Sequence, residues 1–215
     1  MTPSELRIKN FLKRVPPNAP PAVARNVETA LKLADRFSEK AAEIRSNQKL
    51  SAQGKREELV VVASKGFAAH YSQLRKEVDK ALAGIAGEIG GLKKRAVELL
   101  SDGFSAELRR EARGRLHMLT PNDRRRLALE TDDRLLQAAI LEVSPFLAGL
   151  DPDIHAAVEQ RIVESMFSER LAQLEIEHNA WENASAACTV AADEIAREVG
   201  VTREGFGKLA RPEAA

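Results

Sequence analysis

Apolar residues recur at alternating steps of four and three in two long segments of this chain. In the first segment, residues 21 to 47, the apolar positions are Val23, Val27, Ala30, Ala34, Phe37, Ala41 and Ile44. This spacing keeps one stripe of side chains on the same side of an α-helix, as in a coiled coil. The segment is therefore predicted to be one amphipathic helix with a packing seam.

A second stripe runs from about residue 55 to residue 100. Its members are Val60, Ala63, Phe67, Tyr71, Leu74, Val78, Ala81, Ile85, Ile89, Leu92, Ala96 and Leu99. Ser51 and Gly54 favour a turn between the two stripes, which predicts a long antiparallel, coiled-coil-like helical hairpin over residues 21–103. The glycines between Gly84 and Gly91 each cost about 1 kcal/mol in a helix. They predict either a kink near Gly90–Gly91 or the close approach of another helix.

A third stripe, again with steps of four and three, lies near the C-terminus. Its members are Phe167, Leu171, Leu174, His178, Trp181, Ser185, Cys188, Ala192, Ile195 and Val199. Asp151–Pro152–Asp153 is typical of a helix start and Gly200 of a helix end. A long acidic helix is expected between them, with His178 and Ser185 on its seam, where polar residues set register or partner number.

The remaining segments complete an all-α prediction in four parts. Residues 1–20 are expected to form an N-terminal helical arm and a proline-rich linker, Val15–Pro21, and residues 201–215 a C-terminal tail. Residues 21–103 are the hairpin, and residues 104–200 are a helical region that ends in the long acidic helix. This region is predicted to begin with short helices that start at Ser105, Thr120 and Asp132 or Asp133. Only 4% of residues are aromatic and 30% are charged, which favours long helices over a thick core.

The charges are sorted along the chain. Residues 1–126 carry 26 Lys and Arg against 15 Asp and Glu, and residues 127–200 carry 4 against 15, although the formal net charge is only +1. Such asymmetry bears on association rather than on chemistry.

The basic charge is densest between residues 109 and 126. The candidate contact residues there are Arg109, Arg110, Arg113, Arg124, Arg125 and Arg126. They would contact either nucleic-acid phosphates or the acidic stretch after residue 126, in the same chain or in a neighbour. No aromatic residues interleave with them, so base-specific recognition is not predicted. Residues 191–209 also resemble a helix-turn-helix, but glycines at 205 and 207 and an acidic preceding helix count against DNA binding.

Catalytic chemistry is not predicted. The four histidines are scattered without metal-binding spacing, and Cys188, the only cysteine, lies among alanines, where a buried thiol is expected. We therefore expect no enzyme activity, no cofactor and no metal. One cysteine excludes an intrachain disulfide, and the sequence shows neither a signal-peptide pattern nor an apolar run long enough to span a membrane. These features favour the cytoplasm of the producing cell, or a virion assembled there.

Three short motifs, Leu50–Lys55, Leu116–Arg125 and Phe146–Pro152, together resemble helical proteins of unassigned role encoded among bacteriophage and prophage structural genes. The resemblance covers about residues 22–175 and implies a virion or assembly component: a scaffold, an internal or ejected protein, or a connector-associated factor. It transfers no catalytic residues.

The expected function is therefore a structural one, in which copies of the chain pack with each other or with other particle proteins. The expected packing seam comprises Val23, Val27, Phe37, Ile44, Phe167, Leu171, Leu174, Trp181, Cys188 and Ile195. The alternative is a nucleic-acid-associated regulator that uses the basic region 109–126.

Overall fold

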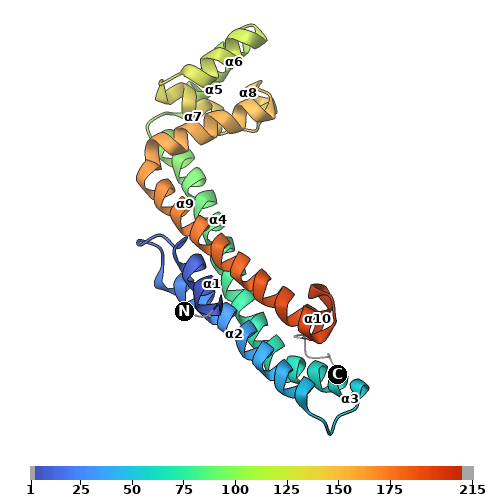
Figure 1. The fold of residues 1–215 in the computed structure, drawn as a ribbon. Helices are drawn as coiled ribbons and strands as arrows, with labels where there is room; N and C mark the ends of the chain where they lie inside the picture. The colour runs from blue at the N-terminus through green and yellow to red at the C-terminus, as the bar shows by residue number, and fades with distance from the viewer. Residues whose placement is uncertain (1–2, 210–215) are drawn as a thin grey trace. The chain divides into compact units, whose positions relative to one another are not determined.

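A computed structural model describes residues 3–209 of the chain, and all regular structure in this range is helical (Figure 1). The all-α prediction is confirmed. The elements are α1 (Pro3–Leu12), α2 (Pro21–Ser46), α3 (Ala52–Val62), a π-helical segment η1 (Ala63–Phe67), α4 (Ala68–Ser101), α5 (Ala106–His117), α6 (Pro121–Glu130), α7 (Arg134–Leu141), α8 (Pro145–Ala148), α9 (Pro152–Val199) and α10 (Arg203–Leu209). Within the described range, no helix combines the length and the apolar character needed to cross a bilayer.

The chain forms two compact units. Unit 1 comprises Met1–Ile85 and Glu175–Ala215, and unit 2 comprises Ala86–Leu174. Helices α4 and α9 each contribute one part to each unit. The units therefore differ from the expected division at residue 103, because the C-terminal part of α9 joins the hairpin rather than the short helices.

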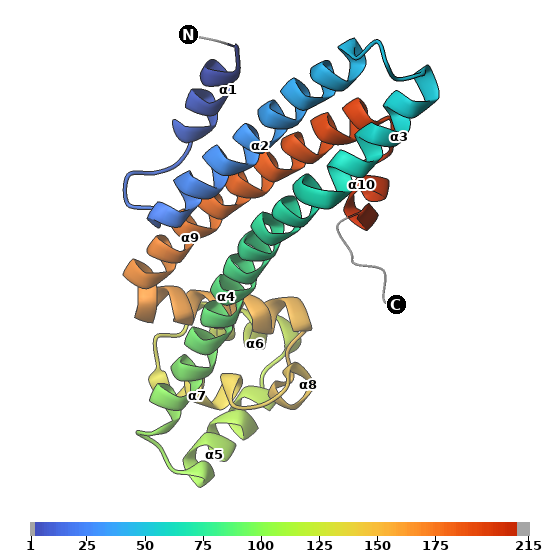
Figure 2. The ribbon, with the colours of Figure 1, turned by 90° about the horizontal axis from the view of Figure 1, so that it is seen from below.

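Unit 1 is built around three helices rather than two. Its parts of α4 and α9 run side by side with α2 (Figure 2). Asn26 of α2, which is only 2% exposed, joins the three: its amide nitrogen donates to the Leu74 carbonyl oxygen over 3.3 Å, and the Cys188 thiol donates to its amide oxygen over 3.4 Å. These two buried hydrogen bonds of Asn26 fix the relative register of the three helices, since only one alignment allows both to form.

Most of the predicted seam residues are buried within a single chain. The side chains of Val23, Val27, Phe37, Leu174, Trp181, Cys188 and Ile195 are all buried. Ile44, Phe167 and Leu171 are only partly buried.

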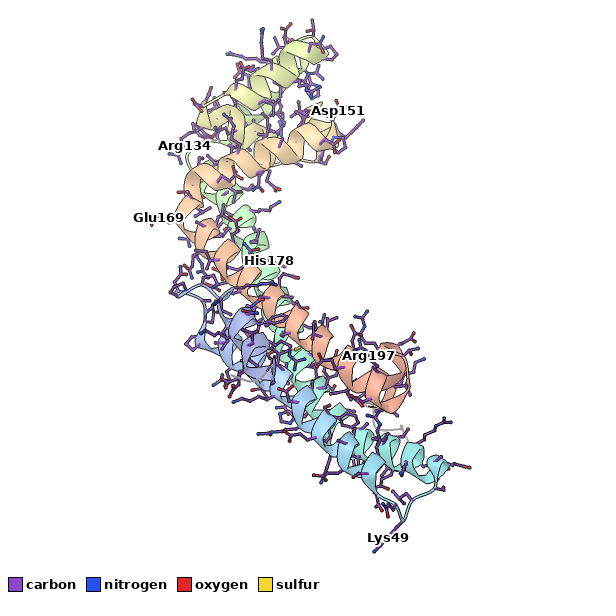
Figure 3. All side chains as sticks on the ribbon, in the orientation of Figure 1. Lys49, Arg134, Asp151, Glu169, His178 and Arg197 are labelled. Carbon is purple, nitrogen blue, oxygen red and sulfur yellow. The ribbon has the colours of Figure 1, made fainter. Side chains whose placement is uncertain are left out.

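The heptad prediction for α9 is wrong in detail. His178, expected on the seam, is exposed (Figure 3), and Ser185 is half-buried and accepts a hydrogen bond from Arg75 at 2.8 Å. Many of the buried positions come instead as neighbouring pairs, such as Ala187 with Cys188. The buried residues of α9 within unit 1 are Ala180, Trp181, Ala184, Ala187, Cys188, Ala191, Ala192, Ile195, Ala196 and Val199. This stripe is wide because α9 packs against two helices, whereas a heptad seam serves one partner.

The π segment shifts the phase of the second stripe. Buried residues are four apart from Leu59 to Ala63 but five apart from Ala63 to Ala68, as expected where one extra residue enters a helical turn. The Phe67 ring meets the Phe37 ring edge-on at 5.0 Å. As a result Leu59 is buried where Val60 was expected.

Neither prediction for the glycines of α4 holds. Helix α4 continues unbroken from Ala68 to Ser101, and a Cβ atom added at Gly84, Gly87, Gly90 or Gly91 would meet nothing within 4 Å. The kink lies instead in α9 at Phe167, whose backbone angles (φ −135°, ψ 30°) are not helical.

Unit 2 packs α5–α8 around its own apolar core. The core includes Leu100, Leu116, Ile140, Leu150, Ile154, Val158 and Ile162. Side-chain caps at Ser105, Thr120 and Asp133 start α5, α6 and α7, since each oxygen satisfies a backbone N–H that the helix leaves unpaired. Gly149, with φ 68°, ends α8.

Candidate interaction surface

An apolar groove of about 350 Å³ opens in unit 2 between α5, α6 and α7. It is lined by Leu108, Glu111, Ala112, Arg115, Leu116, Leu119, Leu127, Asp133, Leu135 and Leu136. Two leucines at its mouth stay open to solvent, Leu108 at 47% exposure and Leu127 at 40%. An apolar floor with charged groups at its rim is the usual chemistry of a binding groove.

Helix α5 supplies one wall of this groove. Leu108, Glu111, Ala112 and Arg115 follow the spacing i, i+3, i+4 and i+7, which places them on one face. Glu111 and Arg115 pair along the helix over 2.6 Å, and both side chains are largely exposed. Because such a pair contributes only about 0.3–0.5 kcal/mol, both groups can change partner at little cost.

A second apolar patch lies where α8 meets the turn between α5 and α6. Phe146 is 87% exposed, Met118 86% and Leu147 57%. A hydrogen bond of 3.0 Å between His117 Nε2 and the Leu147 carbonyl oxygen brings the two segments together. Large apolar side chains clustered in water are typical of a surface that another protein covers.

Two of the candidate arginines pair with the acidic stretch of the same chain. Arg109 donates two hydrogen bonds to the Glu142 carboxylate, from Nε over 3.0 Å and from Nη2 over 2.9 Å. Arg113 donates a third to the same carboxylate over 2.9 Å. Both also donate to carbonyl oxygens, Arg109 to Ser101 and Arg113 to Ala139. The hydrogen bond from Arg109, followed by that from Arg113, lowers the pKa of Glu142 to about 2.

Arg124 is occupied by backbone oxygens. Its guanidinium donates to the carbonyl groups of Leu116, His117, Leu119 and Gly149 at 2.9–3.1 Å. Two of these carbonyls, those of Leu116 and His117, belong to the last turn of α5, where carbonyl groups have no partner within their own helix.

The other candidate arginines lie at the surface. Arg110 and Arg125 are exposed, and Arg126 pairs with Asp123 at 3.2 Å. The structure therefore does not bring the six candidates together as one ridge, because three of them are held by the fold.

His155 and Cys188 have structural surroundings. His155 Nε2 lies 3.1 Å from the Ile140 carbonyl oxygen and 3.2 Å from that of Val143. Cys188 is fully buried, and burial raises its pKa to about 11, so at neutral pH it is not the thiolate that nucleophilic chemistry requires. Across residues 3–209, no three His, Cys, Asp or Glu side chains gather in a way that could hold a metal ion.

The helix-turn-helix pattern ends in a helix used for packing. Phe206 of α10 is fully buried, with its ring 5.4 Å from that of Tyr71. Arg203, at the start of α10, faces Asp193 of α9 at 3.6 Å. Residues 203–209 of the expected tail are thus a docked helix, and residues 210–215 of that tail lie outside the described range.

No protein-family model, curated protein or solved structure matches this chain.

The groove was not predicted from the sequence, although a signal was present. Leu108, Ala112, Leu116 and Leu119 repeat at helical spacing within the arginine-rich segment, where the density of charge obscures an apolar face.

Proposed function

We propose that this chain is a non-enzymatic helical assembly protein that works by packing against copies of itself within a particle. The observation that supports this most directly is the exposed apolar surface of unit 2, the groove beside Leu108 and Leu127 and the patch at Met118, Phe146 and Leu147. Uncovered apolar side chains of this size favour burial by about 25 cal/mol per Å².

The proposed contact does not use the heptad seams. Val27 and Phe37 of α2, and Cys188 of α9, are fully buried inside one chain, so they have no free surface to offer a neighbour. Unit 2 offers exposed leucines and a phenylalanine instead, and assembly through unit 2 leaves the core of unit 1 intact.

The proposed setting, a phage-like particle, rests on the sequence resemblance. Two of its three motifs contain helix starts with side-chain caps, at Ser51 and Thr120, and the third contains the left-handed Gly149. These features shape turns and carry no chemistry, which suits a structural role in any such particle.

Nucleic-acid binding through the basic region has less support. Arg109, Arg113 and Arg124 already donate hydrogen bonds to protein oxygens. A phosphate would have to compete with charge-assisted hydrogen bonds that are already formed.

Sedimentation velocity on the full chain, with a gel-shift assay on duplex DNA, tests the proposal. We expect mass to rise with concentration, and we expect Phe146→Gln to reduce that rise more than Leu99→Gln, a control at a 42% exposed site outside both patches. A chain that stays monomeric at every concentration, yet binds DNA with a steep salt dependence, would replace assembly with the regulator.

A further inference from the structure

Building on the proposed function, we propose that α5 packs antiparallel against α5 of a second copy, with a twofold axis at the level of residue 113. The contact uses the outward face of α5 beside the apolar groove. In Figure 2, α5 lies along the outer edge of unit 2.

This face carries an apolar residue near each end and two opposite charges between them. Leu108 and Met118 stand near the two ends of α5 at 47% and 86% exposure. Between them lie Glu111 and Arg115, whose side chains are 59% and 77% exposed. The spacing of three, four and three residues keeps all four on neighbouring positions of the same side of the helix.

When a second α5 runs in the opposite direction, its residues on this face are complementary to those of the first. With the axis at residue 113, Glu111 lies opposite Arg115 of the second copy, and Leu108 lies opposite Met118 of the second copy. Symmetry repeats each contact, so two ion pairs and two apolar contacts form. Opposite charges meet at both inner positions, and apolar groups meet at both outer ones.

The residues near the axis do not oppose the contact. Arg113 would place like charges close together, but its guanidinium is turned to Glu142 and its side chain is only 17% exposed. Ala112 and Gly114 flank it, and a Cβ added at Gly114 would meet nothing within 4 Å. Small residues at a helix crossing allow the two backbones to approach closely.

The same arrangement argues for a second copy rather than an unrelated partner. A partner carrying one sign of charge would attract either Glu111 or Arg115 and repel the other. A reversed copy satisfies both.

The size of the contact predicts modest affinity. Helix α5 has 12 residues, which is about 18 Å of helix at ~1.5 Å per residue. One helix pair of that length buries less than the roughly 1,200 Å² of a standard stable interface, so we expect a dissociation constant of about 10 µM or weaker.

Charge reversal on the full chain tests this contact without relying on a destabilised fold. Glu111→Lys places two like-charged pairs across the axis, and so does Arg115→Glu. Each variant alone should therefore associate about tenfold or more weakly than the wild type by sedimentation equilibrium. An equimolar mixture of the two should regain affinity near that of the wild type, because the introduced lysine of one variant then lies opposite the introduced glutamate of the other.

Recovery in the mixture cannot come from contacts inside one chain, since each chain still carries its own mismatched pair. Arg110→Glu, which reverses a charge on another side of α5, is the matched control and should leave association unchanged.

Three other results would overturn the proposal. If the wild type associates and neither variant weakens it, assembly stands but uses another surface. If both variants weaken association and the mixture does not recover, the charges do not face each other across a twofold axis. If the wild type does not associate at all, the proposed function fails together with this contact.

Discussion

Glu142 joins α5 to the end of α7, and replacing it with glutamine tests whether charge holds unit 2 together. The carboxylate accepts three hydrogen bonds of 2.9–3.0 Å from Arg109 and Arg113. Glutamine keeps the shape of the side chain and one acceptor oxygen. It removes the negative charge and leaves two guanidinium groups facing a neutral amide.

The size of the effect follows from the pKa of Glu142. Hydrogen bonds from Arg109, and then from Arg113, lower that pKa from 4.5 to about 2, which sets an upper limit of about 3 kcal/mol on the preference for the charged form. The Glu142 side chain is 31% exposed, and solvent screening reduces such energies substantially. We therefore expect Glu142→Gln to lower the free energy of unfolding of unit 2 by about 1–2 kcal/mol at neutral pH.

The effect has a defined pH window. A carboxyl with a lowered pKa in the folded state contributes its full stability above the unfolded value of 4.5, and that contribution falls as the pH drops towards about 2. The stabilities of the wild type and Glu142→Gln should therefore differ by a constant amount above about pH 5. They should converge between pH 4.5 and about 2.

Hydrogen exchange of the α5 and α7 amides measures this difference locally, because the single tryptophan, Trp181, belongs to unit 1 and does not report on unit 2. Glu111→Gln is the matched control, since its pair with Arg115 is exposed and should be worth a few tenths of a kcal/mol. A stability loss for Glu142→Gln that does not change between about pH 2 and 5 would refute the electrostatic argument.

Three further predictions concern other parts of the chain. Gly149→Ala should destabilise unit 2 by about 2–3 kcal/mol in urea unfolding, because the residue has φ 68° and the new Cβ would lie 2.6 Å from the His117 ring; unchanged stability would contradict this. Arg7→Met should speed hydrogen exchange in α1, since Arg7 bonds carboxylates of both α2 and α9, whereas Lys9→Met, at an exposed site, should not. Cys188 should react with a thiol reagent at about pH 8 only as fast as unit 1 opens, because burial raises its pKa to about 11; rapid reaction in the native protein would show that the site is open.

Local signals predicted the helices of unit 2 well. The helix starts at Ser105, Thr120 and Asp133 could be found from the sequence because each depends on one side chain and the backbone three or fewer residues away. The pairing of Arg109 with Glu142 was one of two open alternatives, since charge counting shows that partners exist but not which residues meet. The four carbonyl contacts of Arg124 had no sequence signal, because backbone acceptors are the same at every position.

The errors arose where packing overrode periodicity. A stripe traced from Phe167 placed His178 on the seam, yet the stripe began at a kink that neither proline nor glycine marks. Conversely, the glycines of α4 predicted a break that is absent. Exposed glycine raises the energy of a helix but removes no backbone hydrogen bond, so the helix can remain intact. Glu88, which lies between these glycines, also pairs with Arg170 of α9.

The five residues of η1, from Ala63 to Phe67, also bear on how the chain could be shortened. A π turn holds one residue more than the α turn it replaces, which is the result that inserting a single residue into an older helix would give. Removing one residue from this segment would restore a regular helix from Ala52 to Ser101. A variant that lacks one residue of this segment should therefore form that regular helix and lose the edge-on packing of Phe67 against Phe37.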